Sequence, residues 1–526
     1  MGLGPLKLPL LACAAVCGAL ALPPAAGAAP YMVSIMQDDN QLAYGTPSQR
    51  RDALNRMKAL GVEAVRVTLL WKALAPDSSE KKKPRGFNGA DPGDYPARHW
   101  DNFDDLVIAA KERGIAVYLN PTGSGPRWAH GTTGSRLQRS WRPDPVEFGK
   151  FVRAAGRRYS GKYVDENGTK AKLPRVDWWA IWNEGNQPGW LSPQGAKVKG
   201  VGRIALSPHL YRDLLVAGAR ALRRTGHADD LVLIGETAPL GEEKAKGPGS
   251  ALRPGLFLRE MFCLNRRYRS YRGRAAEARN CDGVGKLDVL AQFPRLGFGH
   301  HPYTKKLSPR KRDKGRDAMT MANIGSLPRA LDKIATRTGL LPQDMPVFLT
   351  EYGYETSPPD PFSGVSEALQ AEYLNEGDYI AWKHPRIFSN AQFQLFDVPP
   401  REEFPRDSTA YWFTYQSGLF TARPSAKPKP AASAYAFPLV ARQKGANARI
   451  WGQVRFAPNG ATQEVVLQVK QRGSQSWKIS GGLIEVTHSQ GYFQTKRPSA
   501  AGATWRAVWV EPDRSGVMFS REAVAR

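Results

Sequence analysis

The chain has 526 residues, of which 41% are hydrophobic and 23% are charged, so it carries enough apolar material for a large core. This composition is close to the average of globular proteins, and it excludes a small single module, a wholly disordered chain and a protein with many membrane spans. The net charge of +27 indicates attraction to an acidic partner such as nucleic acid, an anionic cell-wall polymer or an acidic glycan.

The N-terminus has the pattern of a secretory signal peptide. Lys7 precedes a long apolar run, and the small residues Ala26, Gly27 and Ala28 follow it. A lipoprotein signal at Cys13 is the alternative, but the apolar stretch before this cysteine is too short. We therefore predict that residues 1–28 are removed and that the protein is secreted, extracellular or attached to the cell wall. Export argues against nucleic acid as a partner, and no later apolar run predicts a membrane span.

Short apolar segments alternate with helical patterns along the next 400 or so residues. Eight segments are predicted strands: 31–36, 62–71, 114–121, 176–184, 230–237, 296–303, 345–353 and 386–396. Apolar residues recur at helical spacing between them, at 49–61, 100–114, 145–161, 209–226, 327–339 and 369–383. Eight such units favour an α/β fold, a (β/α)8 TIM barrel. A doubly wound nucleotide-binding sheet is the weaker interpretation, because no Gly-rich phosphate loop follows the first strand.

Two cysteines remain after the predicted leader, Cys263 and Cys281. In an oxidising compartment we expect them to form one disulfide, worth about 3 kcal/mol in the chain-entropy model. Two free buried thiols are the alternative. No Cys/His spacing indicates a zinc site.

The ends of the fourth and seventh predicted strands carry acidic residues. Asn183 and Glu184 end the fourth strand, and Glu351 ends the seventh. In a (β/α)8 barrel the chemistry lies at the C-terminal ends of the strands. Two carboxylates across the mouth of the barrel suit glycoside hydrolysis, in which one protonates the leaving oxygen and the other attacks the sugar or activates water.

With these motifs, the chain resembles retaining glycoside hydrolases of the clan that includes family 5 cellulases and family 39 glycosidases, over roughly residues 30–435. The resemblance implies that Glu184 is the acid/base, which starts protonated because of the nearby Glu351 charge, and that Glu351 is the nucleophile. It implies that Asn183 donates to the sugar 2-hydroxyl. No cofactor or metal is needed for this chemistry.

Two further matches lie on other strands. The clan's His-x-Tyr of strand six matches His301, Pro302 and Tyr303, so that Tyr303 would hydrogen-bond the nucleophile and His301 would face the sugar. His300 is the alternative inward-facing residue, since a slip of one residue reverses the faces of a strand. Arg66 matches the clan's arginine near the end of strand two and would pair with Glu351, holding it ionised.

The chain also departs from the clan's pattern. The histidine common after strand three is missing, and the tryptophan common at strand eight is replaced by Gln394 or Phe396. A standard cellulase or mannanase site is therefore not expected. Glu236 and Glu355 are competing carboxylates for which we expect structural or peripheral roles.

Aromatic residues on loops after the strands are candidate sugar platforms, because sugar rings stack on aromatic planes. Trp190 lies six residues after Glu184, and Trp128 follows the third strand. Both are predicted to bind substrate, with core packing as the alternative.

Two basic loops, 81–86 and 305–316, follow the second and sixth strands and should rise on the catalytic face. If they line the cleft, the substrate is an anionic glycan; the alternative is a solvated basic surface.

The pattern changes after residue 435. Residues 440–526 alternate apolar and polar side chains between Gly, Ser, Asn and Pro, which predicts five to seven short strands. We expect an immunoglobulin-like β-sandwich similar to fibronectin type III modules, which supports the barrel or binds glycan through Trp451, Trp477, Trp505 or Trp509. The predicted organisation is thus a signal peptide (1–28), a barrel (29–435) and a β-sandwich (440–526).

Together these features predict a secreted retaining glycosidase acting on a polysaccharide or oligosaccharide, with an anionic glycan and a cell-wall polymer as the candidate partners. The alternative is a barrel that binds glycan or cell wall without cleaving it.

Overall fold

The computed structural model describes residues 29, 31–167, 171–511 and 516–526. The predicted signal peptide lies outside the described residues. None of the helices in these ranges is long and apolar enough to cross a membrane.

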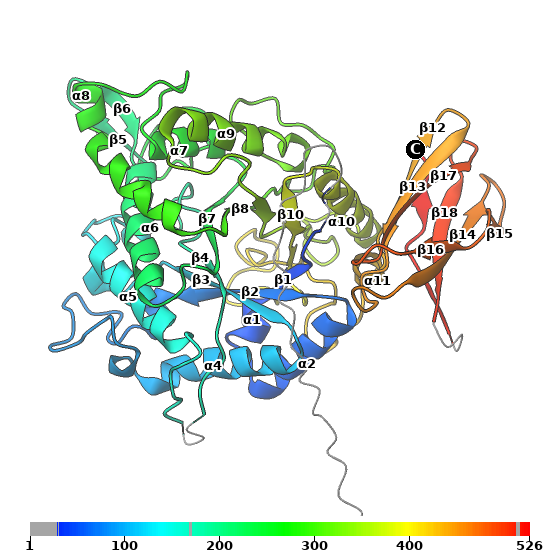
Figure 1. Cartoon of the computed structure of the whole chain (residues 1–526), viewed down its shortest axis with the longest axis horizontal. Helices are drawn as coiled ribbons and strands as arrows, with labels where there is room; N and C mark the ends of the chain where they lie inside the picture. Colours follow the sequence, from blue (N-terminus) through cyan, green and yellow to red (C-terminus); the bar gives the residue numbers. More distant parts are fainter. Residues whose placement is uncertain (1–28, 30, 168–170, 512–515) are drawn as a thin grey trace, which may run out of the picture.

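A closed barrel of parallel strands, each followed by at least one helix, forms the larger part of the molecule (Figure 1). Its strands are β1 (Ile35–Gln37), β2 (Ala64–Leu70), β3 (Ala116–Thr122), β4 (Trp178–Ala180), β7 (Leu231–Thr237), β8 (Leu296–His300), β9 (Val347–Leu349), β10 (Ile387–Asn390) and β11 (Gln392–Phe393). The last two are one strand interrupted at Ala391. Because β10 pairs with β9 and β11 pairs with β1, this strand closes the barrel. The predicted (β/α)8 fold is confirmed.

The longer helices that follow the strands are α2 (Pro47–Ala59), α4 (Ala97–Glu112), α5 (Pro145–Arg158), α6 (Ser207–Arg224), α7 (Pro254–Met261), α9 (Ser326–Thr338), α10 (Glu367–Trp382) and α11 (Pro430–Ala436). Shorter helices are α1 (Asp39–Leu42), α3 (Trp71–Leu74) and α8 (Arg274–Glu277). Local signals fix several starts. Thr46 and Gln49 form a capping box before α2, and the Asp144 side chain caps α5, each with proline at the first helical position.

In the barrel part of the chain, one hairpin was not predicted, and the state of the two cysteines had been left open. A hairpin of β5 (Gly195–Val198) and β6 (Gly202–Ala205) lies between β4 and α6, and its short strands gave no clear pattern in the sequence. Cys263 and Cys281 form a disulfide, as expected, with their Cα atoms 5.7 Å apart.

Removing the disulfide should lower stability without touching the site. We expect the Cys263→Ser/Cys281→Ser variant to lose about 3 kcal/mol of unfolding free energy, because the unfolded chain regains the entropy of an open loop. Urea unfolding measures the loss. An unchanged midpoint would contradict the prediction.

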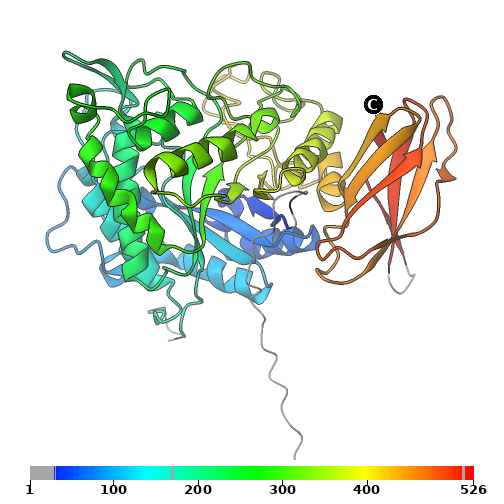
Figure 2. The same cartoon turned by 45° about the horizontal axis from the view of Figure 1, so that its top comes forward.

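The second part of the chain consists of two antiparallel sheets (Figure 2). One contains β12 (Leu439–Lys444), β13 (Asn447–Gln453) and β17 (Tyr492–Pro498). The other contains β14 (Gln463–Lys470), β15 (Lys478–Ile479), β16 (Ile484–Val486), β18 (Thr504–Val510), β19 (Val517–Phe519) and β20 (Ala523–Val524). A separate apolar cluster, which includes Trp505 and Trp509, fills the space between them. The likeness to fibronectin type III modules and the boundaries 29–435 and 440–526 stay predictions.

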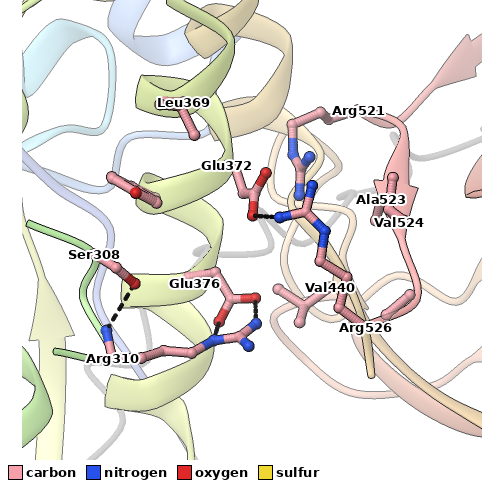
Figure 3. Close-up of a pocket in the computed structure, with 12 residues that line it drawn as sticks. Ser308, Arg310, Leu369, Glu372, Glu376, Val440, Arg521, Ala523, Val524 and Arg526 are labelled. Carbon is pink, nitrogen blue, oxygen red and sulfur yellow. Dashed lines mark hydrogen bonds and ion pairs between the residues drawn. The ribbon is translucent and has the colours of Figure 1, made fainter. Parts of the chain in front are cut away.

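The sheets are packed firmly against the barrel through α10. The Trp451 ring lies 5.5 Å from Tyr379 and 5.7 Å from Trp382, and Arg455 pairs with Asp378 at 2.9 Å. Figure 3 shows the polar part of this junction, a cavity of about 170 Å³ where Arg526 reaches Glu372 at 3.3 Å. Trp451, one of the four tryptophans considered for glycan binding, therefore packs at the junction and supports the barrel.

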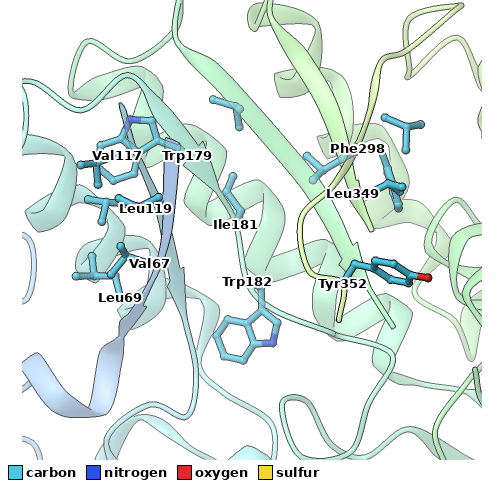
Figure 4. Packing of buried hydrophobic residues seen from close by; sticks show 14 of the residues in the cluster. Val67, Leu69, Val117, Leu119, Trp179, Ile181, Trp182, Phe298, Leu349 and Tyr352 are labelled. Carbon is cyan, nitrogen blue, oxygen red and sulfur yellow. The ribbon is translucent and has the colours of Figure 1, made fainter. Parts of the chain in front are cut away.

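Alternation along the strands divides the barrel into two layers. One set of side chains packs under the helices, including Val67, Val117 and Trp179 (Figure 4). The other set points into the barrel, where residues such as Tyr118 and Trp178 form a second apolar cluster. This inner cluster fills the barrel interior below the polar residues at the strand ends.

Candidate active site

Glu184 and Glu351 lie together at the C-terminal ends of the barrel strands. Glu184 follows β4 and Glu351 follows β9. One oxygen of each carboxylate and one ring nitrogen of His301 lie within 4.8 Å of one another. The backbone at Glu184 has φ 39°, a left-handed conformation that non-glycine residues rarely adopt and that is found at functional sites. The Glu184 side chain is 18% exposed, so it can be reached from outside.

A cavity of about 530 Å³ opens onto Glu184. Tyr303, Lys305 and Gln187 also line it. Lys305 belongs to the second predicted basic loop, so part of this loop does lie beside the candidate site.

His301 is held between carboxylates. Its Nδ1 lies 2.9 Å from Glu184 and 3.6 Å from Glu351, and its Nε2 lies 3.2 Å from Glu236. Burial lowers the pKa of His301, but the Glu351 charge and the hydrogen bond to Glu184 outweigh it and raise the pKa to about 10. His301 is therefore an imidazolium at neutral pH. The side chain is fully buried and both nitrogens lie beside carboxylates, and the expected contact of His301 with the sugar stays a prediction.

His300, the alternative, points elsewhere. It binds Thr237 at 2.9 Å and the Met319 carbonyl at 2.6 Å, and burial lowers its pKa to about 3.

The His301 charge makes stability depend on alkaline pH. The folded-state pKa of about 10 lies above the ordinary 6.5, so the stabilisation is complete below pH 6.5 and is lost as the pH rises through 10. We expect the wild type to lose unfolding free energy over this range more steeply than His301→Gln, in urea titrations at several pH values. His300→Gln is the matched control and should keep the wild-type slope. Equal slopes for wild type and His301→Gln would contradict the assignment.

Arg66 binds several polar side chains of the site at once. Its guanidinium is fully buried and donates to Glu351 at 2.7 Å, to Asn183 Oδ1 at 2.7 Å, to Glu236 at 2.7 and 3.1 Å, and also to Gln37. The predicted pairing with Glu351 is present, but the charge is shared with Glu236. Burial, together with the charges of Glu184 and Glu236, raises the pKa of Glu351 above its ordinary value and outweighs the lowering by His301 and Arg66. The expectation that Arg66 holds Glu351 ionised stays a prediction.

Asn183 is oriented by the same arginine. Its side-chain oxygen is bound by Arg66, and its backbone N–H donates to Thr122 Oγ1 at 2.9 Å. Among the described residues its Nδ2 has no hydrogen-bond acceptor, which leaves this group available to donate to a sugar hydroxyl.

Glu236, for which a structural or peripheral role was expected, lies at the centre of the site. Its fully buried carboxylate accepts hydrogen bonds from Tyr118 at 2.6 Å and Thr350 at 3.1 Å in addition to Arg66. Burial raises its pKa, but Arg66 and His301 outweigh burial and lower it to about 2. Without an exposed surface, Glu236 is a structural carboxylate, although it lies at the centre of the site.

A register shift places Glu236 there. Gly235 pairs with Gly299 and Thr237 pairs with His300, so Glu236 is skipped, and its φ of 44° turns the side chain inward. Gly299 opposite makes room, because a Cβ at that position would overlap the Glu236 carboxylate. The sequence signal is the pair of glycines at 235 and 299 on neighbouring strands.

Tyr303 donates its hydroxyl to Glu351 at 3.2 Å, in the geometry that the resemblance implied. Burial and the Glu351 charge raise the pKa of Tyr303 far above its ordinary value, so the hydroxyl keeps its proton. Phe393 packs edge-on against Tyr303 at 6.3 Å and fixes the ring. Phe396, considered for this strand, instead packs on Phe420 at 5.6 Å.

Replacing Tyr303 by phenylalanine tests this contact. A hydrogen bond to a charged group is worth about 1.5–3 kcal/mol, so we expect Tyr303→Phe to lower kcat by roughly 10- to 100-fold with little change in KM. Steady-state kinetics on the substrate found by screening measures it. Tyr352→Phe, whose hydroxyl binds Tyr354 at 3.0 Å, is the control and should retain the rate. An effect confined to KM would contradict the proposed contact with the nucleophile.

The two candidate aromatic platforms differ. Trp128 packs edge-on against Trp71 at 6.2 Å and Phe87 at 5.8 Å, and its Nε1 donates to the Pro76 carbonyl at 3.2 Å. This packing explains Trp128 without a sugar. Trp190 is half-buried and lies three residues after Gln187, which lines the cavity, so its platform role stays a prediction.

Glu184, His301 and Glu351 could in principle offer three ligand atoms to a metal ion. An imidazolium has no free lone pair on either ring nitrogen, and the raised pKa keeps His301 in this form at neutral pH. A metal ion at this site would therefore have to displace the His301 proton.

Among solved structures, the chain is similar to a family 39 glycoside hydrolase from the gut symbiont Bacteroides cellulosilyticus WH2 (14% identity, 90% of this chain and 81% of that chain, TM-score 0.44). It is also similar to an endo-β-1,4-mannanase from Thermotoga petrophila (13%, 94% and 98%, TM-score 0.40) and a family 1 β-glucosidase from Thermotoga maritima (14%, 74% and 85%, TM-score 0.44). No protein-family model and no curated protein matches the chain.

Proposed function

We propose that the chain is a glycoside hydrolase that cleaves O-glycosidic bonds with retention of configuration. The observation that carries the proposal is the pair Glu184 and Glu351, with carboxylate oxygens within 4.8 Å at the mouth of a (β/α)8 barrel. Retaining enzymes keep their two carboxyl groups about 5–5.5 Å apart, whereas inverting enzymes need about 6.5–9.5 Å to admit a water molecule. The short gap favours direct attack on the sugar.

The surroundings of the two carboxylates divide their roles. Glu351 receives two donors, Arg66 and Tyr303, which stabilise its charged form as the nucleophile. Glu184 lines the open cavity, where a leaving oxygen can reach it as the acid and later a water molecule can reach it as the base. In the proposed cycle, Glu184 first gives a proton to the leaving oxygen and then takes one from the attacking water molecule.

Export of the protein is part of the proposal. The Cys263–Cys281 disulfide supports an oxidising compartment, in agreement with the predicted signal peptide. The substrate would then be an extracellular or cell-wall polysaccharide or oligosaccharide.

Release of reducing sugar from a panel of polysaccharides and aryl glycosides tests the activity. We expect wild-type protein to hydrolyse at least one of them and the isosteric variants Glu184→Gln and Glu351→Gln to be strongly impaired. Binding without hydrolysis by all three proteins would favour the alternative, a glycan-binding barrel.

A further inference from the structure

A second cavity, of about 390 Å³, lies on the same end of the barrel. Residues that follow β2 and β3 form it, among them Lys72, Ser78, Ser124, Arg127 and the more distant Arg139. Its Ser124 lies two residues after Thr122, whose Oγ1 accepts the Asn183 N–H at 2.9 Å, so the same β3 end contacts the candidate active site.

The cavity is positively charged and its cations are unpaired. Lys72, Arg127 and Arg139 line it, and among the described residues no carboxylate does. Within the same described ranges, none of the three side chains makes an ion pair or a hydrogen bond. In the two predicted basic loops, two of the cations are paired: Lys83 with Glu147 at 2.8 Å and Arg310 with Glu376.

The walls of this cavity are tied together by backbone contacts. Lys72 N donates to Ser124 O at 2.9 Å, and Arg127 N donates to Ser78 O at 2.8 Å. His130 Nε2 accepts from the Gly125 N–H at 3.0 Å, and its Nδ1 lies 3.2 Å from the Trp141 carbonyl. Burial lowers the pKa of His130 to about 4, so it is a neutral support and adds no charge.

The β3 end also joins this cavity to the strand that carries Glu184. A Cβ at Gly123 would overlap the Trp182 ring, so glycine is needed for the close approach of the two strand ends. Trp182 lies two residues before Glu184. A glycan bound at Glu184 could therefore extend along this rim to the cavity.

We propose that the Lys72–Arg127–Arg139 cavity binds an oxyanion substituent of a glycan, the carboxylate of a uronic acid or a sulfate ester, beside the catalytic pair. Unpaired guanidinium and ammonium groups with no competing carboxylate are the recognition chemistry for such groups. As a subsite for the substrate, this cavity rests on the proposed glycosidase function.

Isothermal titration with D-glucuronate and with inorganic sulfate, at constant ionic strength, tests the cavity directly and distinguishes the two anions. We expect saturable binding of at least one anion and none of D-glucose. The Lys72→Ala/Arg139→Ala variant should bind at least about tenfold more weakly, because charge-assisted hydrogen bonds are lost. Lys111→Ala/Arg220→Ala, which removes the same charge from the exposed surfaces of α4 and α6, is the matched control and should bind as wild type does.

Hydrolysis of a neutral aryl glycoside separates this inference from the proposed function. The Lys72→Ala/Arg139→Ala variant should cleave it at the wild-type rate. Absence of binding by both anions, or equal binding by the wild type and this variant, would overturn the cavity assignment. Intact anion binding in a protein that cleaves no glycoside would refute the glycosidase function and leave the anion site standing.

Discussion

Replacing Glu351 by alanine should lower kcat by at least about 10³-fold, since loss of the nucleophile removes at least about 4 kcal/mol of transition-state stabilisation at 1.36 kcal/mol per tenfold change. Glu351 is the carboxylate that Arg66 and Tyr303 hold at 2.7 and 3.2 Å. Its removal leaves no attacking atom in the site. Steady-state kinetics with an activated aryl glycoside measures the loss.

Rescue by sodium azide distinguishes the two glutamates. In Glu351→Ala, azide should attack in place of the carboxylate and give a glycosyl azide of inverted configuration. In Glu184→Ala, the glycosyl-enzyme still forms, so the azide product should retain the configuration. Glu355→Ala is the control, because Glu355 follows the same strand and is not proposed as the nucleophile. Burial and the Asp360 charge raise its pKa to about 7. A Glu351→Ala variant with wild-type activity would contradict its role.

Replacing Arg66 by methionine should destabilise the fold by about 3–5 kcal/mol, the cost of leaving a buried charge without its partner. Arg66 is fully buried and binds both Glu236 and Glu351, so two buried carboxylates lose their counter-charge. Urea unfolding measures the change. The same variant should lose most of its activity, because Asn183 and Glu351 are no longer oriented.

A second substitution separates the charge effect from packing. Arg66→Met/Glu236→Gln removes one uncompensated carboxylate, so its loss should be smaller than the sum of the two single losses. Arg220→Met, at an exposed position of α6, is the control and should leave the free energy of unfolding nearly unchanged. If Arg66→Met lost less than about 1 kcal/mol of unfolding free energy, the proposed role of Arg66 as a buried counter-charge would be contradicted, since that is the range of surface ion pairs.

The strand ends were the part of the site that the sequence could predict. Polar residues that end predicted parallel strands must gather at one rim, so Glu184, Glu351 and Tyr303 were found from the order of elements and the family resemblance. Arg66 lies inside β2 and was found from the resemblance. Their contacts depend on side chains from strands that are far apart in the chain. No local pattern reports such contacts.

Glu236 and His301 show what sequence reasoning could not supply. A structural role was expected for Glu236, but its inward direction depends on one residue of β7 being skipped in the pairing with β8, and a strict alternation would place it outside. His301 was chosen over His300, but its contact with Glu236 at 3.2 Å follows from this shift. Trp128 packs on aromatic neighbours, and the sequence does not separate such packing from stacking on a sugar, so its substrate role stays a prediction.

The structure shows where some of the positive charges of the chain lie. The basic loops at 81–86 and 305–316 are partly neutralised by Glu147 and Glu376. Three further cations without a partner among the described residues, Lys72, Arg127 and Arg139, line the cavity after β2 and β3, a placement that charge counting along the sequence cannot reveal.

Mass spectrometry after incubation with a panel of 2-deoxy-2-fluoro aryl glycosides tests the central claim most directly, because the fluorine slows breakdown of a covalent glycosyl-enzyme. We predict that wild-type protein gains the mass of one fluorosugar and that peptide mapping places it on Glu351. Turnover of the parent glycoside with no adduct on Glu351, or an adduct on another residue, would contradict the account.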